Sequence, residues 1–291
     1  MALIPPAFLD AVVAIGFPRE DEKTQWAASG FLYGQFFEKI DEGTSRYRTY
    51  LVTNRHVLEN ERTVVLRFNP EADEPAREYR ADLVDTSGQA VWAPHPDGRI
   101  DVAVLTVSVE YFRNQGVRTF FFQDDRHVLF RDQCIAKGLT EGDGVFVLGF
   151  PLGQVGAPRN FVIARQGIIA RIRDWLAGAA TEFLIDASVF PGNSGGPVIN
   201  RPEAIAITGT SPINSAYLLG VVSGFLPYLD VAVSAQTRRP RVTFEENSGL
   251  ASVIPADFIR ETIDAYATAH PLLPPPPGGT VTEAPLDTPG T

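Results

Sequence analysis

Short apolar runs separated by turn residues fill most of the chain between residues 27 and 254. These runs are rich in Val, Ile, Phe and Tyr and are bounded by Gly, Pro, Asn or Asp, which is typical of β-strands. Strands are expected at 30–33, 47–53, 63–68, 101–107, 144–150, 165–171, 182–185, 197–200, 217–223 and 249–254. So many short strands, without alternating helices, predict an all-β fold in two halves, 27–115 and 143–254, joined by a mixed connection at 116–142.

The two ends of the chain show other patterns. Residues 1–26 are expected to form an apolar lead-in, either a short helix or a strand packed on the body. A helix is expected at 255–270, because a proline opens this segment and Ile259 and Ile263 lie one helical turn apart. Residues 271–291 begin with a proline tract and are expected to be an extended or disordered tail.

Composition and charge narrow the class of protein. The 291 residues are 44% hydrophobic and 21% charged, which is ordinary for a folded protein rather than a disordered one. A net charge of −10 disfavours nucleic acid and anionic membrane surfaces as partners, since neither attracts an acidic protein. No apolar run reaches the roughly 18 residues that a membrane span needs, so a soluble chain with no membrane partner is expected.

Cysteine and histidine content bears on compartment and cofactors. Cys134 is the only cysteine, which excludes an intrachain disulfide and leaves too few thiols for a structural zinc site. Cys134 is expected to be a buried, inert thiol, and His95 and His127 are expected to have ordinary surface roles. We therefore expect no metal, no cofactor and a reducing, cytoplasmic location, with a periplasmic or secreted location as the alternative.

A serine set among glycines marks residues 190–198, whose sequence is FPGNSGGPV. Glycines allow a tight turn that lifts the hydroxyl of Ser194 clear of the backbone and aims neighbouring N–H groups at one point. A group of N–H donors aimed at one point favours a negatively charged atom there.

Two upstream stretches carry the groups that such a serine lacks. His56 lies at the end of the predicted strand in YLVTNRHV, and Asp101 opens the apolar strand DVAVL. A hydroxyl, an imidazole base and an orienting carboxylate together make up the set needed for nucleophilic catalysis. The sequence therefore predicts that His56, Asp101 and Ser194 meet in a cleft between the two halves.

The serine stretch also fits G-x-S-x-G, the nucleophile elbow of α/β-hydrolases, in which serine precedes the acid and the histidine. The only histidine after Ser194 is His270, which lies between a predicted helix end and a proline tract. The order His56, Asp101, Ser194 is instead that of the chymotrypsin type, and the strand-rich pattern favours the same class.

Together these motifs resemble chymotrypsin-like serine proteases, and among them the bacterial trypsin-like peptidases of the HtrA (Deg) type. The matching stretches are LVTNRHV (51–57), IDVAVL (100–105), GDGVFVLGFPLG (142–153), QGII (166–169) and PGNSGGP (191–197). The resemblance implies two six-stranded antiparallel β-barrels followed by a C-terminal α-helix. It also implies a bacterial serine endopeptidase that acts on protein or peptide substrates.

The same resemblance implies a role for each residue of the site. Ser194 would attack the peptide carbonyl, His56 would carry the proton, and Asp101 would fix the imidazole. The N–H groups of Gly192 and Ser194 would form the oxyanion hole. Ser223 matches the serine that hydrogen-bonds the catalytic aspartate in the family.

Residues that line the substrate pocket can also be carried over from the family. They are Ser188, Ser223, Gly224, Phe225 and Gly249. None of them is charged, whereas recognition of Lys or Arg would need a buried acid. Cleavage after small or medium uncharged residues is therefore expected, with Phe225 narrowing the entrance.

Residues 225–248 are a long insertion between two strands that border this pocket, a place where loops often select partners. Control of activity is expected to come from a regulatory protein partner or from loop ordering. Two alternatives stay open: an esterase that uses the same triad, and a protease-like binding module without turnover.

Overall fold

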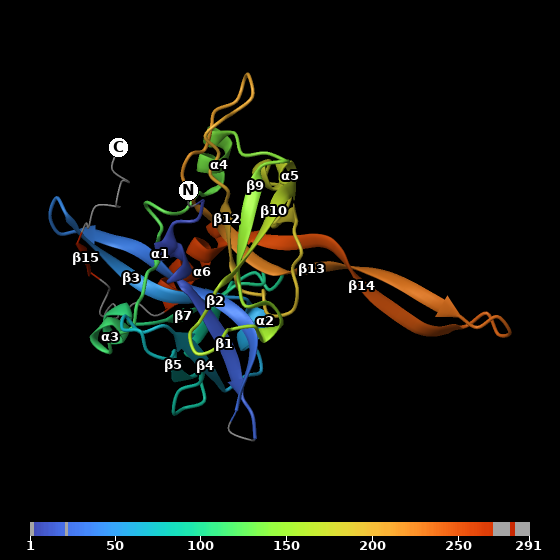
Figure 1. The fold of residues 1–291 in the computed structure, drawn as a ribbon, viewed down its shortest axis with the longest axis horizontal. Coiled ribbons are helices and arrows are strands. Elements are labelled where there is room, and N and C mark those ends of the chain that lie inside the picture. Colours follow the sequence, from blue (N-terminus) through green and yellow to red (C-terminus); the bar gives the residue numbers. More distant parts are fainter. Residues whose placement is uncertain (1–2, 21–22, 270–279, 283–291) are drawn as a thin grey trace.

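The computed structural model describes residues 3–20, 23–269 and 280–282, and two β-sheets are the main regular structure of this part of the chain (Figure 1). The strands of the first sheet are β1 Val12–Pro18, β2 Thr24–Lys39, β3 Thr44–Thr53, β4 Thr63–Phe68, β5 Arg77–Asp82, β6 Trp92–Pro94, β7 Ala103–Thr106, β8 Phe122–Gln123 and β15 Thr280–Thr282. The strands of the second sheet are β9 Gly144–Gly149, β10 Ile163–Arg171, β11 Phe183–Asp186, β12 Pro197–Asn200, β13 Leu218–Val233 and β14 Pro240–Pro255. The helices are α1 Pro6–Leu9, α2 Arg55–Leu58, α3 Val109–Asn114, α4 Arg131–Lys137, α5 Arg173–Leu176 and α6 Ala256–Ala269, with a 3-10 turn at Pro151–Gly153.

The first sheet runs in the order β5-β4-β1-β2-β3-β7-β6, with β8 beside β2 and β15 beside β3. Within the described residues no ladder joins β5 to β6, so the sheet stays open where the resemblance implied a closed six-stranded barrel. A physical reason is the short edge strand β6, which ends at Pro94, a residue with no N–H to donate. The expectation of a closed first barrel is therefore met only in part.

The second sheet closes into a barrel in the order β10-β11-β14-β13-β12-β9. This confirms the predicted second barrel of six antiparallel strands. Its interior is filled by buried aliphatic side chains such as Val147, Ile185, Val198 and Val253. Closure leaves no free edge in the barrel body, so the loop between β11 and β12, which carries the serine stretch, is anchored at both ends.

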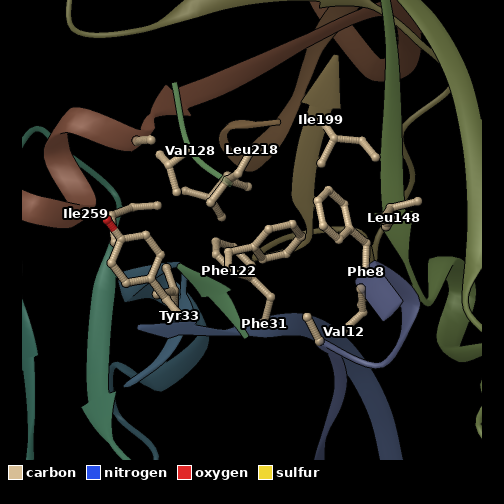
Figure 2. Packing of buried hydrophobic residues seen from close by; sticks show 14 of the residues in the cluster. Phe8, Val12, Phe31, Tyr33, Phe122, Val128, Leu148, Ile199, Leu218 and Ile259 are labelled. Carbon is tan, nitrogen blue, oxygen red and sulfur yellow. The ribbon is translucent and has the colours of Figure 1, made fainter. Parts of the chain in front are cut away.

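A shared apolar cluster joins the two sheets (Figure 2). Phe31 and Phe122 come from the first sheet, Leu148 and Ile199 come from the second, and Ile259 comes from α6. Each side chain of this size contributes about 1.5–3 kcal/mol when fully buried. The two sheets therefore form one packed body, and side chains contributed by opposite sheets can hold fixed positions relative to each other.

Helix α6 closes over both sheets, and the predicted helix is confirmed. Ile259 and Ile263 are fully buried, and Tyr266 packs against the shared cluster on the same face. From the outer face, the Glu261 carboxylate approaches Nε2 of His95, which follows β6, at 3.3 Å. The helix thus ties the end of the barrel strand β14 to the first sheet.

The insertion after Phe225 is a β-hairpin, not a loop. Strands β13 and β14 continue far beyond the barrel and project from the body (Figure 1). Their ladder ends at the pair Val233 and Pro240. We call residues 227–247 the arm. The expectation of a loop at 225–248 is wrong because β-branched and aromatic residues favour extended strands here, even without a core to pack on.

Part of the predicted tail is a strand. Residues 280–282 form β15, which pairs with residues 44–46 of β3. The rest of 271–291 lies outside the described residues. In the stretches that the structure describes, no helix has the length and hydrophobicity needed to cross a bilayer.

Cys134 and His95 lie in the interior, and His127 is half-buried. Cys134 is buried as expected, and burial raises the pKa of its thiol to about 12, which makes it unreactive. His95 is also buried, and its Nδ1 accepts the N–H of Asp97 at 3.0 Å. His127 packs against Phe120, and burial lowers the pKa of its imidazole to about 4. The surface roles expected for the two histidines are therefore wrong, because their polar neighbours in sequence hid apolar neighbours in space.

Candidate active site

The backbone around His56 is held in place by Asn54. Strand β3 ends at Thr53, and Asn54 precedes the single turn of α2. The buried Asn54 side chain donates from Nδ2 to the carbonyl oxygen of Asp101 at 2.7 Å. This bond joins the start of α2 to the segment before β7, so His56 is presented beside Asp101 with half of its side chain exposed to solvent.

His56 and Asp101 form a close pair. Nδ1 of His56 lies 2.6 Å from Oδ2 of Asp101, and the backbone N–H of His56 donates to Oδ1 of the same carboxylate at 3.1 Å. Two contacts from one residue fix both the position and the rotation of the imidazole. A nitrogen this close to a carboxylate carries the ring hydrogen, which leaves Nε2 free to accept a proton.

The charge of Asp101 is set by competing effects. Burial by itself raises the pKa of a carboxyl group, but the hydrogen bonds and charge of His56, together with the hydroxyl of Ser223, hold the pKa of Asp101 below its usual value. The Ser223 hydroxyl donates to Oδ2 at 2.7 Å. Asp101 is therefore ionised near neutral pH.

The turn around Ser194 needs its glycines. Gly192 has φ +98° and Gly195 has φ +82°, in the left-handed region that side chains rarely adopt. A Cβ on Gly192 would lie 2.4 Å from the carbonyl oxygen of Phe150, and one on Gly195 would lie 2.1 Å from the carbonyl oxygen of Ser29. The predicted tight turn is therefore present, and only glycine fits these two positions.

Two peptide groups of this turn are anchored so that their N–H groups face outward. The carbonyl oxygen of Pro191 accepts the N–H of Leu152 at 2.6 Å, and that of Asn193 accepts the N–H of Gly196 at 2.8 Å. In a trans peptide the next N–H points the opposite way. The N–H groups that follow, on Gly192 and Ser194, have no partner among the described residues. They are available to an external acceptor.

Ser29, a fully buried residue of β2, braces the turn from the first sheet. Its hydroxyl donates to the carbonyl oxygen of Gly192 at 2.7 Å and accepts the N–H of Phe150 at 2.9 Å. Its own N–H donates to the carbonyl oxygen of Ser194 at 2.9 Å. Sequence reasoning missed Ser29, because a serine in an apolar strand carries no motif.

Ser223 of β13 connects the serine to the acid. Its carbonyl oxygen accepts the Ser194 hydroxyl at 3.1 Å, while its own hydroxyl binds Asp101. Since His56 contacts the same carboxylate, one chain of contacts runs from Ser194 through Ser223 and Asp101 to His56. The tertiary structure thus brings together residues that lie far apart in the sequence.

The residues expected to line the pocket lie on neighbouring strands. Gly224 and Phe225 of β13 pair with β14, and both are half-buried. The carbonyl oxygen of Gly249 accepts the N–H of Ala187 at 3.0 Å, which places the exposed Ser188 next to this edge of β14. These positions form one connected border beside Ser223.

Asp186 was not expected at this border. It is the last residue of β11, it is exposed, and its Oδ1 lies 3.8 Å from the position that a Cβ on Gly249 would occupy. No motif in the sequence indicates this approach, because Asp186 comes close to Gly249 only through the pairing of β11 with β14. An exposed carboxylate therefore lies beside Gly249, one of the residues expected to line the pocket.

Within the described residues no group of three or more His, Cys, Asp or Glu side chains is arranged to hold a metal ion. The chemistry of the site is that of a hydroxyl, an imidazole, a carboxylate and backbone N–H groups.

A strand-rich body built on a β-barrel, with a serine in a glycine-rich turn and a nearby His–Asp pair, is typical of serine peptidases. The family model of the trypsin-like peptidase domain matches residues 28–205, and the chain belongs to this family. The matched range contains His56, Asp101 and Ser194 but stops before β13, the arm and α6.

Among solved structures, the Rv3671c protease in its inactive form is 19% identical over 89% of this chain and 90% of that chain, with a TM-score of 0.42. No curated protein matches the chain.

Proposed function

We propose that the chain is a serine endopeptidase in which Ser194 is the nucleophile and His56 the general base and acid. In this proposal Asp101 orients the imidazole and stabilises its positive charge. The observation that carries this proposal is the bridge at Ser223, which contacts Ser194 with its carbonyl and Asp101 with its hydroxyl. Membership in the trypsin-like peptidase family supports the same reaction class.

The proposed reaction has two halves. Ser194 Oγ attacks the carbonyl carbon of the scissile peptide while His56 Nε2 takes the hydroxyl proton. The imidazolium, stabilised by ionised Asp101, then gives this proton to the leaving amine, and an acyl-enzyme remains. Water repeats the sequence with the same base and releases the acid product.

The outward N–H groups of Gly192 and Ser194 are the proposed oxyanion hole. These N–H groups have no hydrogen-bond partner among the described residues, and the hydrogen-bonded carbonyl groups of the same peptides fix their direction. They therefore need no rearrangement when negative charge develops on the substrate. Loss of one such donor typically costs about two to three orders of magnitude in rate.

One observation favours the second candidate, a protease-like module that binds without turnover. The Ser194 hydroxyl donates to the Ser223 carbonyl, so its proton is directed away from a base. Rotation about the Cα–Cβ bond, which moves between staggered positions, is the step that would deliver Oγ to His56. The endopeptidase proposal therefore includes this rotation when substrate pairs with the Ser223 carbonyl.

We propose cleavage after small or medium uncharged residues, since Ser188, Gly224, Phe225 and Gly249 bring no charge to the pocket. A peptide library with every residue at the cleaved position tests this preference. Preference for Lys or Arg would contradict it and would point to Asp186, and loss of that preference in Asp186→Asn would identify the carboxylate responsible.

The function is tested with purified Ser194→Ala. We expect this variant to lose at least three orders of magnitude in peptide hydrolysis with its folding unchanged, because no other group can form the acyl-enzyme. The control is Ser211→Ala, which removes an exposed serine outside the site. Full activity in Ser194→Ala would refute the proposal.

A fluorophosphonate probe separates the alternatives. Labelling of Ser194 in the wild type, absent in Ser194→Ala, supports a reactive nucleophile, whereas no labelling favours the binding module. Turnover of esters without turnover of peptides would favour the esterase.

A further inference from the structure

The arm exposes large apolar side chains that no other described part of the chain covers. Its strands run beside each other away from the body (Figure 1). The large apolar side chains that are 44–58% exposed there are Tyr228, Leu229, Val231, Val233, Val242 and Phe244. The register places Leu229 and Val231 on one face of the ribbon and Tyr228, Val242 and Phe244 on the other. A two-stranded ribbon is marginally stable alone, and exposed apolar groups on it mark an interaction surface.

The outer edge of β14 is free along the arm. Strand β11 pairs with β14 only from Leu250 to Val253. Among the described residues, positions 240–247 therefore have β13 on one side and no strand on the other. An unpaired edge of this length presents N–H and C=O groups that another strand can bind.

The charges of the arm are separated along its length. Near the tip lie the three basic residues Arg238, Arg239 and Arg241. Nearer the barrel lie the three acidic residues Asp230, Glu245 and Glu246. No ion pair joins any of these six to another described residue. Arg241 and Glu245 are about 13 Å apart along the strand, since each residue adds about 3.3 Å, so they do not pair within one chain.

We propose that the arm is a dimerisation element that pairs with a second copy of this chain. In the proposed dimer, β14 lies antiparallel to β14 of the other protomer about a two-fold axis at Thr243. Arg241 then faces Glu245 of the partner subunit, and Val242 faces Phe244 of the partner subunit. Each contact occurs twice because the axis relates the two copies.

The register follows from both charge and hydrophobic pattern. A shift by one residue, which places Arg241 opposite Glu246 of the partner subunit, also sets apolar Val242 opposite a glutamate. The axis at Thr243 matches unlike charges and apolar residues together. Because the arm carries three charges of each sign in separate groups, a second copy supplies the complement of both groups.

A single introduced cysteine tests the axis. Thr243→Cys is expected to form a disulfide-linked dimer under mild oxidation, since the two copies of this residue meet at the axis. The control is Thr237→Cys at the exposed tip, whose two copies would lie about 40 Å apart in the proposed register. The native Cys134 is buried and does not compete.

A charge exchange tests the contact across the axis in the full chain. Sedimentation analysis is expected to show a concentration-dependent dimer for the wild type and dimerisation roughly tenfold weaker or more for Arg241→Glu and for Glu245→Arg, since each places like charges opposite each other twice. The double variant Arg241→Glu/Glu245→Arg is expected to recover the dimer. The control Arg80→Glu, on the exposed face of β5, changes the net charge by the same amount as Arg241→Glu and is expected to behave as wild type.

Three results would overturn the proposal: a wild-type chain that is monomeric at the highest soluble concentration, which would leave the arm to a different protein; crosslinking at Thr237→Cys but not at Thr243→Cys; or a double charge variant that stays dissociated. None of these measurements depends on hydrolysis, so the proposal stands or falls separately from the endopeptidase activity.

Discussion

Ser29 donates two hydrogen bonds to the turn that carries Ser194, although it belongs to the other sheet. Its hydroxyl and N–H hold the carbonyl groups of Gly192 and Ser194 and the N–H of Phe150. These bonds lock the direction of the peptide groups around the proposed oxyanion hole. A buried hydroxyl of this kind acts on the site through position, without touching substrate.

Ser29→Ala is expected to lower kcat roughly tenfold or more with little change in KM, because the turn loses its brace. It is also expected to cost about 1–3 kcal/mol of unfolding free energy, since two buried backbone groups lose their partner. Steady-state kinetics and urea unfolding measure the two effects.

The control for Ser29→Ala is Thr49→Val. Thr49 is equally buried in the first sheet, and its hydroxyl donates to the carbonyl oxygen of Val107 at 2.6 Å, away from the turn. We expect this variant to lose stability and to keep its kcat. Equal kcat losses in both variants would show that Ser29 has no specific effect on the turn.

At the scale of elements, α6 is one of the parts that join the two sheets. It follows β14 of the barrel directly, and its inner face packs on residues of both sheets. The helix is therefore a structural clamp, and its effect on the site is through the relative position of β3, β7 and β13.

Ile263→Ala is expected to cost about 2–5 kcal/mol, the usual range for removing a large aliphatic side chain from a packed core. The side chain of Ile263 is completely buried. The control is Thr268→Ala on the exposed side of α6, which we expect to change stability by less than about 0.5 kcal/mol. Similar losses for the two variants, measured by urea unfolding, would contradict the clamp.

At the scale of the whole molecule, the titrations of His127 and Asp124 change stability in opposite directions at low pH. Burial lowers the pKa of His127 from 6.5 to about 4, so between these values the unfolded chain binds a proton that the native chain does not. Acidification through this range destabilises the fold. Burial, aided by the charge of Asp125, raises the pKa of Asp124 from 3.8 to about 6. Here the native chain binds the extra proton, so acidification stabilises the fold.

Asp124→Asn should expose the histidine effect. The variant lacks the group that gains stability on acidification, so its unfolding free energy is expected to fall more steeply than that of the wild type between pH 6 and pH 4. Urea unfolding at these two pH values measures the difference. The control, Glu61→Gln at an exposed position, is expected to follow the wild type, and a slope for Asp124→Asn no steeper than the control would contradict the prediction.

The local pattern of apolar and polar residues was enough to predict the strands of the barrel and α6. Each of these elements buries one face, and its apolar residues recur with the period of that face. The serine turn was also predictable, since glycine is needed wherever φ is positive or backbone approaches closely. Pattern failed at the arm, where apolar residues alternate on a strand without a core in its own chain. It also failed at β6, which is too short to carry a period.

The sequence by itself determined the strand-rich class, the strands of the second half, the final helix and the candidate residues His56, Asp101 and Ser194, because these depend on local periodicity and on short motifs. Only the tertiary structure decided the open first sheet, the brace by Ser29, the bridge through Ser223 and the approach of Asp186 to Gly249. The physical reason is that each of these depends on which strands become neighbours. That choice is made by long-range burial over the whole chain, and no short stretch records it.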